Sequence, residues 1–306
     1  MRVYTHSACL RHQPSPAHPE HPGRLATVVG ALREAFPQQL EWIEAPAASD
    51  EQLARAHSRR LIAQLREQSP ASGLYRLDED TVMSPGSLES ALHSAGAVCA
   101  AIDAVMTARQ RRAFCAVRPP GHHSSGDQAM GFCLFNQIAV GARHAQAVHA
   151  LVRVAIVDFD VHHGNGTQSI FEADPQVLFV SSHQSPLYPG SGRVAETGVG
   201  NVVNGELVPG AGSVEFRRLW RERLLPAIDA FEPELILISA GFDAHRLDPL
   251  ADLNLVAADY HWITMELMRL ADRHAQGRIV STLEGGYSLT ALRECSVAHV
   301  RALLGE

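Results

Sequence analysis

The chain contains Val154-Ala155-Ile156-Val157-Asp158-Phe159-Asp160-Val161-His162-His163-Gly164-Asn165-Gly166-Thr167, in which an apolar run ends in acidic and histidine side chains. The apolar run predicts a strand that is buried on both faces, as in a parallel sheet. The two glycines and the asparagine then predict a turn. Because ligands of open α/β sheets bind beyond the carboxyl ends of strands, this stretch predicts a binding site as well as a fold.

The residue types after this strand suit a metal ion. Side chains two apart on extended backbone share a face, so Asp158, Asp160 and His162 are expected to converge. Carboxylate oxygens and imidazole nitrogens bind zinc, and a catalytic zinc needs a third protein ligand and an open position for water. Capping of the strand end is the alternative, but a single Asp would suffice for that. The pattern therefore favours a divalent-metal site.

Composition restricts the class of protein. The chain has 306 residues, of which 46% are hydrophobic and 19% are charged, as in a globular enzyme. No apolar run is expected to reach the roughly 20 residues of a membrane span, and the first residues lack the apolar region of a signal peptide. A cytoplasmic location without membrane contact is therefore expected. The net charge of −7 argues against a nucleic-acid partner.

Two residue types exclude further classes. All 26 basic residues are arginine, which excludes Schiff-base lysine chemistry and the Gly-Lys of a P-loop. The cysteines are odd in number and scattered, so they fit neither a disulfide framework nor a Cys-x-x-Cys metal site. They are expected to be reduced. The five are Cys9, Cys99, Cys115, Cys133 and Cys295.

Apolar periodicity predicts strands that alternate with helices along the whole chain. This alternation, without a linker or an internal repeat, predicts one α/β domain around a parallel sheet, covering residues 1–306. The segments 17–24 and 69–86 are expected to be irregular. Strands are expected at 2–6, 41–44, 113–117, 154–157, 177–181, 201–208, 235–239 and 279–283, and helices at 25–36, 49–65, 87–108, 137–149, 168–172, 213–228, 256–274 and 290–304.

Four polar clusters follow predicted strands, at 122–123, 158–165, 243–245 and 284–287. Parallel strands bring such loops to one edge of the sheet. We expect the metal to be bound by Asp160, His162 and Asp243, which leaves a position for water.

The other polar residues of these clusters suit proton transfer. His122 and His123 lack ligand spacing and are expected to be general acid–base groups, and Tyr287 is expected to donate an O–H to an oxyanion. Each assignment has a structural alternative: a hydrogen-bonded histidine pair, a helix N-cap for Asp243, and a packing role for Tyr287. His163 and His245 are expected to be structural.

Five motifs, in this order, resemble the histone deacetylase family, most of all its bacterial and class II branch, the histone-deacetylase-like amidohydrolases. They are residues 119–123, 131–136, 158–167, 241–245 and 284–287, and the similarity runs from residues 18–20 nearly to the C-terminus. The resemblance implies the arginase/deacetylase fold, with a parallel sheet of about eight strands flanked by helices. It also implies attack of zinc-activated water on an amide carbonyl.

The resemblance assigns roles to the polar residues. It implies zinc on the three ligands named above, with His123 as general base and acid and Tyr287 as the tyrosine that stabilises the transition state. It pairs His122 with Asp158, and His123 with Asn165, where class I relatives have Asp.

The resemblance also predicts the surroundings of the reacting groups. Gly131, Phe132 and Tyr188 would line an acyl-lysine tunnel, and Arg24 would lie in an internal acetate channel. A structural potassium ion is expected near Asp158, Asp160, His162, Ser181 and Ser182.

The leading expectation is a deacylase of acyl-lysine on proteins or peptides, with small acylated amines such as acetylpolyamines as the alternative substrates. Relatives that prefer polyamines carry Glu at the tunnel rim, where this chain has Leu250. Asp80, in the acidic run 78–80, is the further substrate-binding candidate, and this run would bind the cation if polyamines were preferred.

Three further alternatives stay open. The first is a catalytically inactive acyl-lysine reader. The second is an arginase-like binuclear enzyme in which His123 and Asp158 bind a second metal ion, and the third is an enzyme that uses iron(II) in place of zinc.

Overall fold

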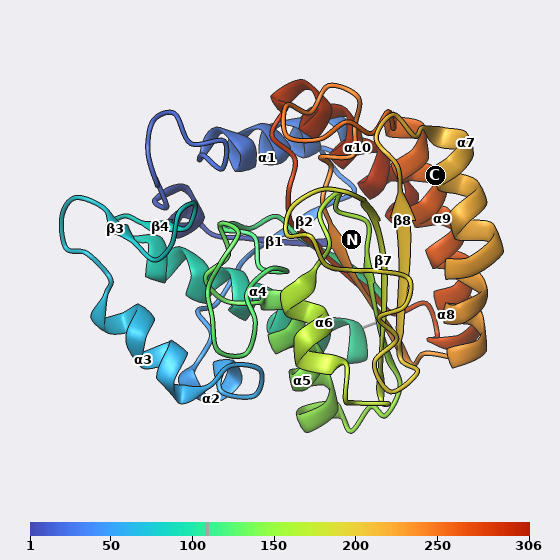
Figure 1. The fold of residues 1–306 in the computed structure, drawn as a ribbon, viewed down its shortest axis with the longest axis horizontal. Helices are drawn as coiled ribbons and strands as arrows, with labels where there is room; N and C mark the ends of the chain where they lie inside the picture. Colours follow the sequence, from blue (N-terminus) through green and yellow to red (C-terminus); the bar gives the residue numbers. More distant parts are fainter. Residues whose placement is uncertain (108–109) are drawn as a thin grey trace.

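Eight parallel strands form the central sheet of the computed structural model, which describes residues 1–107 and 110–306. The strand order is β2-β1-β5-β10-β9-β6-β7-β8, and every neighbouring pair is parallel. Figure 1 shows the edge strand β8 beside β7. The predicted α/β fold with about eight strands is therefore confirmed. The strands are β1 (Arg2–Thr5), β2 (Glu41–Glu44), β5 (Arg112–Cys115), β6 (Val154–Asp158), β7 (Val177–Gln184), β8 (Val202–Leu207), β9 (Leu235–Ala240) and β10 (Ile279–Leu283).

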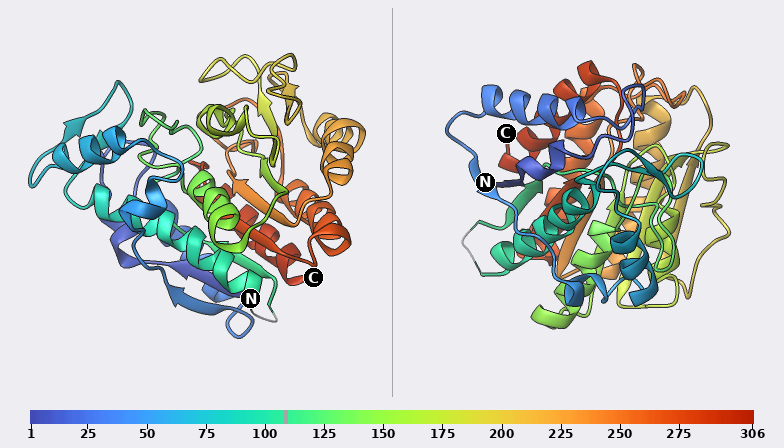
Figure 2. Two further views of the ribbon diagram at one scale, coloured as in Figure 1. Left: turned by 90° about the horizontal axis from the view of Figure 1, so that it is seen from below. Right: turned by 90° about the vertical axis from the view of Figure 1, so that its left-hand side faces the viewer.

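Helices cover both faces of the sheet (Figure 2). One group packs α4 against α5 and α5 against α6, and the other packs α1 against α10, α10 against α9 and α9 against α8. The helices are α1 (Gly23–Ala35), α2 (Asp50–Leu53), α3 (Arg59–Glu67), α4 (Ser87–Thr107), α5 (Gln137–His149), α6 (Asn165–Phe171), α7 (Ser213–Leu219), α8 (Leu225–Phe231), α9 (Ala257–His274) and α10 (Leu289–Leu304). Shorter elements are the 3-10 turn Ser7–Leu10, the π-helical turn Trp220–Leu224, and the hairpin of β3 (Tyr75–Arg76) and β4 (Val82–Met83).

The two-sided cover explains the composition of the central strands. Every residue of β6, β9 and β10 is buried, which is why these strands are mostly apolar and do not alternate between apolar and polar residues. Contrary to the expectation from the sequence, α4 has the length and composition of a membrane-crossing helix, with 21 residues and a window of mean hydropathy 1.2. However, 67% of that window is buried within the protein, where α4 packs on α5, β1, β5 and β10. Its apolar residues therefore serve the core.

Two predicted helices are divided. The segment 49–65 forms α2 and α3, because Ser49 and Ser58 each accept a backbone N–H, from Gln52 and Leu61 respectively, and so start a new helix. The segment 213–228 is divided by the π-helical turn before α8, whose first turn contains a proline.

Other predicted boundaries differ less from the structure. From its residue type, Ser213 is expected to be an N-cap, but it is the first residue of α7, and its hydroxyl donates to Asp259 at 2.6 Å. The segment 69–86 contains the short hairpin β3–β4, and the predicted end of a helix at Ala108 lies outside the described residues.

The sheet brings the four polar clusters together. They follow β5, β10, β9 and β6, which are consecutive in the sheet order although they are far apart in the chain. Because all four strands are parallel, their carboxyl ends lie at the same edge. The topology alone therefore places the predicted metal ligands, histidines and tyrosine side by side.

Candidate metal centre and active site

Three buried side chains beyond β6 and β9 form a group that suits a metal ion. One ligand atom from each of Asp160, His162 and Asp243 lies within 4.8 Å of the other two. The Nδ1 atom of His162 lies 3.1 Å from Asp160 Oδ1 and 3.3 Å from Asp243 Oδ2. The latter contact lacks hydrogen-bond geometry, so Asp243 Oδ2 is buried without a partner. A divalent cation would satisfy this oxygen, and the donor set fits such an ion.

The remaining oxygens of both carboxylates are fixed by backbone groups. Asp160 Oδ2 accepts the N–H of Gly285 at 2.8 Å, and Asp243 Oδ1 accepts that of Val161 at 2.8 Å. A Cβ at Gly285 would lie 2.0 Å from Asp243 Oδ2, so only glycine permits this close approach. The alternative role of Asp243 as a helix N-cap does not apply, because the next helix, α9, begins at Ala257.

The two histidines have different partners. His122 Nδ1 lies 2.9 Å from Asp158 Oδ2, and His123 Nδ1 lies 2.8 Å from Asn165 Oδ1. Both predicted pairs are therefore present. An amide oxygen only accepts hydrogen bonds, so the proton of neutral His123 is assigned to Nδ1. This leaves Nε2 of His123 able to accept a proton.

The surroundings also separate the pKa values of the two histidines. Burial lowers the pKa of His123 well below its ordinary value, and the neighbouring His122 and His162 lower it further. Burial also lowers the pKa of His122, but the carboxylates of Asp160 and Asp158 outweigh it and hold this pKa well above its ordinary value. The pair thus provides one neutral and one positively charged imidazole.

Tyr287 lies beside these groups with its ring under a guanidinium. The Cζ atom of Arg24 lies 4.9 Å from the ring centroid. Arg24 is fully buried and donates to the carbonyl of Gly286 at 2.5 Å, to the carbonyl of Glu284 at 2.6 Å, and to Glu20 Oε1 at 2.9 Å. Burial raises the pKa of Tyr287 well above its ordinary value, so its O–H remains a donor. The role of Arg24 in an acetate channel stays a prediction.

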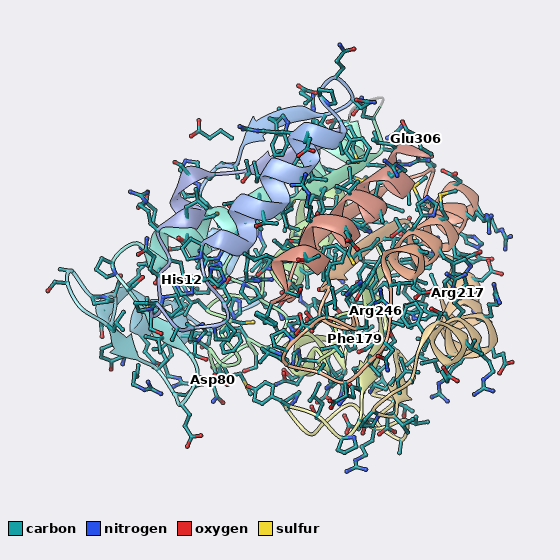
Figure 3. The ribbon with its side chains drawn as sticks, turned by 90° about the horizontal axis from the view of Figure 1, so that it is seen from above. His12, Asp80, Phe179, Arg217, Arg246 and Glu306 are labelled. Atoms are coloured by element: carbon teal, nitrogen blue, oxygen red, sulfur yellow. The ribbon has the colours of Figure 1, made fainter. Side chains whose placement is uncertain are left out.

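A cavity of about 250 Å³ opens next to this centre. All the residues predicted to contact substrate line this cavity. Phe132 has a φ of 67°, a left-handed conformation that is rare for a bulky residue and marks a constrained position. Asp80 comes from the connection between β3 and β4 (Figure 3). The lining residues are Asp80, His123, Gly131, Phe132, His162, Leu187, Tyr188, Leu250 and Tyr287.

The predicted potassium ligands are only partly free. Asp158 of β6 pairs with Ser181 of β7, so these residues are adjacent. The hydroxyl of Ser181 bonds to His183 Nδ1 at 2.9 Å, and that of Ser182 accepts from the indole N–H of Trp220 at 3.2 Å. His183 Nε2 donates to the carbonyl of Gly192 at 2.9 Å, so its Nδ1 accepts from Ser181, whose oxygen keeps lone pairs for a cation. The potassium site stays a prediction.

A second group of possible metal ligands joins α4 to α5. Asp103 Oδ1 lies 2.8 Å from His144 Nε2 and 2.7 Å from His149 Nε2. Arg55 donates to His144 Nδ1 at 2.8 Å, which assigns the proton of His144 to Nε2, where a metal would bind. These hydrogen bonds link α4 to α5.

Sequence reasoning missed three residues of the site. Leu187 lines the cavity, but it lies in a loop without periodicity. Glu284 Oε2 accepts the N–H groups of Gly121 at 2.6 Å and His122 at 3.2 Å, and Asp248 Oδ2 accepts that of Tyr287 at 2.7 Å. Glu284 lies within the motif 284–287, whereas Asp248 lies beyond the motif 241–245, two residues before Leu250, and bonds from a carboxylate to distant backbone have no sequence pattern.

Comparisons with known proteins agree with this geometry. Residues 18–303 match the family model described as histone deacetylase domain. The chain is 38% identical over 325 residues to histone deacetylase 14, chloroplastic, of Arabidopsis thaliana, covering 99% of this chain and 77% of that protein. It is 41% identical over 272 residues to the histone deacetylase-like amidohydrolase of Pseudomonas aeruginosa, covering 87% and 71%. A crystal structure of the HDA15 HD domain has a TM-score of 0.95 at 35% identity, covering 100% of this chain and 88% of that chain.

Proposed function

This chain belongs to the histone deacetylase family, and we propose that it is a zinc-dependent deacylase that hydrolyses N-acyl-lysine amides on proteins or peptides. The observation that carries the proposal is the arrangement of the cavity. His162 of the Asp160–His162–Asp243 group, the neutral imidazole of His123 and the phenol of Tyr287 all line the same 250 Å³ space. An acyl group that enters this space meets the three kinds of group that amide hydrolysis requires.

Asp160, His162 and Asp243 would hold the metal. When bound there, zinc would polarise the amide carbonyl and lower the pKa of a water molecule toward about 7. The same ligand set also accepts iron(II), and the metal present in the cell depends on availability as well as affinity.

The chain's own residues would move the proton and stabilise charge. His123 accepts a proton from the attacking water at Nε2 and delivers it to the departing amine nitrogen. His122, held positive by Asp160 and Asp158, stabilises the negative charge that develops nearby. Tyr287 donates its O–H to the carbonyl oxygen as that charge forms.

The lining of the cavity favours acyl-lysine. Phe132, Tyr188, Leu187 and Leu250 provide apolar surface for a chain of four methylenes that ends in a neutral amide. The second candidate substrate is an acetylpolyamine, and the observation that favours it is the partly buried carboxylate of Asp80 in the same lining. An ammonium group near the amide needs such a partner to offset its desolvation.

Steady-state kinetics on both substrate classes tests the proposal. We expect acetyl-lysine peptides to exceed N-acetylputrescine and N8-acetylspermidine in kcat/KM by about tenfold or more, equivalent to about 1.4 kcal/mol. Preference for the polyamines would refute the lysine assignment and favour Asp80 as a cation site. Binding without turnover would indicate a reader, and two metal ions per chain would indicate binuclear chemistry.

A further inference from the structure

The turn that carries Tyr287 contains two glycines and needs external support. Gly286 has a φ of 115°, a conformation open to glycine and rare for other residues. Asp160 holds the N–H of Gly285, and Arg24 holds the carbonyls of Glu284 and Gly286. These contacts fix the start of the turn. The N–H of Tyr287 itself is held by another residue.

That residue is Asp248. Its Oδ2 accepts the N–H of Tyr287 at 2.7 Å and that of Ser288 at 3.3 Å, and its Oδ1 accepts the N–H of Leu250 at 3.0 Å. Asp248 is 7% exposed, so little water competes for these hydrogen bonds. The N–H of Asp248 donates to the carbonyl of His245 at 2.8 Å, so the anchor is itself fixed.

We propose that Asp248 is a positioning residue for Tyr287, which it fixes together with the rim residue Leu250. The loop that carries Asp248 also carries the metal ligand Asp243, so one loop sets both the metal side and the tyrosine side of the cavity. This inference rests on the proposed function. A displacement of about 1 Å at a reacting group costs up to about 10²-fold in rate, so the anchor acts on turnover.

The alternative role for Asp248 is to stabilise the start of α10. The N-cap of α10 is Ser288, whose hydroxyl accepts the N–H of Ala291 at 3.4 Å. The bond from Asp248 to Ser288 is 0.6 Å longer than its bond to Tyr287, at 3.3 Å against 2.7 Å. The shorter bond therefore goes to the residue with the reacting group. If Asp248 only capped α10, its replacement would lower the stability of the protein. Any accompanying decrease in kcat would then be the same with and without the hydroxyl of Tyr287.

A double-mutant cycle separates the two roles. Asp248→Ala and Asp248→Asn are made in the wild-type and Tyr287→Phe backgrounds, and kcat and KM are measured on an acetyl-lysine peptide with zinc present. In the wild-type background we expect Asp248→Ala to lower kcat at least tenfold and to change KM less than threefold. Asp248→Asn should restore part of kcat, because its amide oxygen still accepts the N–H of Tyr287. In the Tyr287→Phe background, Asp248→Ala should lower kcat less than threefold, and an equal loss in both backgrounds overturns the proposal.

A matched control and a measurement without substrate complete the test. Asp252, on the same loop, accepts from Gln184 Nε2 at 3.2 Å, and Asp252→Ala should keep kcat within threefold. Hydrogen exchange of residues 284–290 should be at least tenfold faster in Asp248→Ala than in the wild type, and unchanged in Asp252→Ala.

If hydrogen exchange of residues 284–290 is the same in Asp248→Ala as in the wild type, Asp248 does not hold the turn and the proposal is wrong. If Asp248→Ala does not fold, the exchange and kcat of Asp248→Asn decide in the same way. A wild type that does not hydrolyse acetyl-lysine refutes the proposed function, whereas the exchange result still decides whether Asp248 holds the turn.

Discussion

His299 is a titratable group in the middle of the core, and it makes the stability of this fold depend on pH. The imidazole is fully buried, with the rings of Phe159 and Phe242 at centroid distances of 5.8 and 5.9 Å. Its Nδ1 lies 2.7 Å from Thr264 Oγ1 and its Nε2 lies 2.8 Å from Ser281 Oγ. The hydroxyl of Thr264 donates to the carbonyl of Tyr260, so it accepts from Nδ1 of a neutral imidazole.

Burial lowers the pKa of His299 from 6.5 to about 3. The unfolded chain therefore binds the proton more tightly than the folded chain, and the stability that neutral His299 provides is fully present above pH 6.5 and decreases as the pH falls toward 3. Linkage with these two values gives a loss of about 1.4 kcal/mol between pH 7.5 and pH 5.5, and about 2.7 kcal/mol by pH 4.5.

Replacement of His299 by Gln removes the titration and retains hydrogen-bonding groups. The free energy of unfolding of the metal-free wild type and of His299→Gln is measured in urea at pH 7.5, 5.5 and 4.5, so that loss of metal at low pH does not contribute. The contributions of the other histidines cancel in the difference between the two proteins. The wild type should lose about 1.4 kcal/mol more than the variant by pH 5.5. Parallel pH curves, within about 0.3 kcal/mol, would refute the reasoning.

Four variants test the site. Asp243→Ala should abolish both zinc content, measured by elemental analysis, and activity; stoichiometric zinc in this variant contradicts the ligand assignment. His123→Ala should retain zinc and lose about 10²–10⁴-fold in kcat, and a loss below about threefold assigns proton transfer to another group. Tyr287→Phe should lower kcat on acetyl-lysine by about 10²–10³-fold and spare a trifluoroacetyl substrate, whereas equal losses indicate a packing role. Leu250→Glu should narrow or reverse the kcat/KM preference for acetyl-lysine over acetylpolyamines, and an unchanged ratio places the selectivity elsewhere.

The sequence predicted the sheet well, because the central strands are buried on both faces. Uninterrupted apolar runs such as 154–157 and 235–238 have few other interpretations, and α5 (Gln137–His149) was predicted with its observed bounds. The segment 49–65 was predicted less well. Its apolar spacing is helical throughout, but a second capping serine restarts the helix at Arg59. The apolar spacing predicted helical structure in this segment, but the second capping serine divided it into two helices.

The site was predictable where chemistry is local, and not where it depends on contacts between loops. The Asp160 and His162 pair follows one strand, so their spacing alone indicates a shared face. Asp243 joins them because β9 lies beside β6, which agrees with the expectation that parallel strands bring their polar ends to one edge of the sheet. The contacts of Glu284 with Gly121 and of Asp248 with Tyr287 depend on loops that are far apart in the chain.

These contacts explain how irregular loops hold reacting groups in fixed positions. Each of the four strand-end loops is joined to another by a buried carboxylate that accepts backbone N–H groups: Asp160 holds Gly285, Asp243 holds Val161, Glu284 holds Gly121 and His122, and Asp248 holds Tyr287. Such bonds need no particular side chain on the partner loop, so they restrain the backbone and leave its side chains free for chemistry. The arrangement also places several carboxylates in a region with little solvent, where His122 and Arg24 offset part of the negative charge. A divalent cation at the group of Asp160, His162 and Asp243 would offset part of this cost. The same carboxylates therefore organise the loops and create the need for the metal.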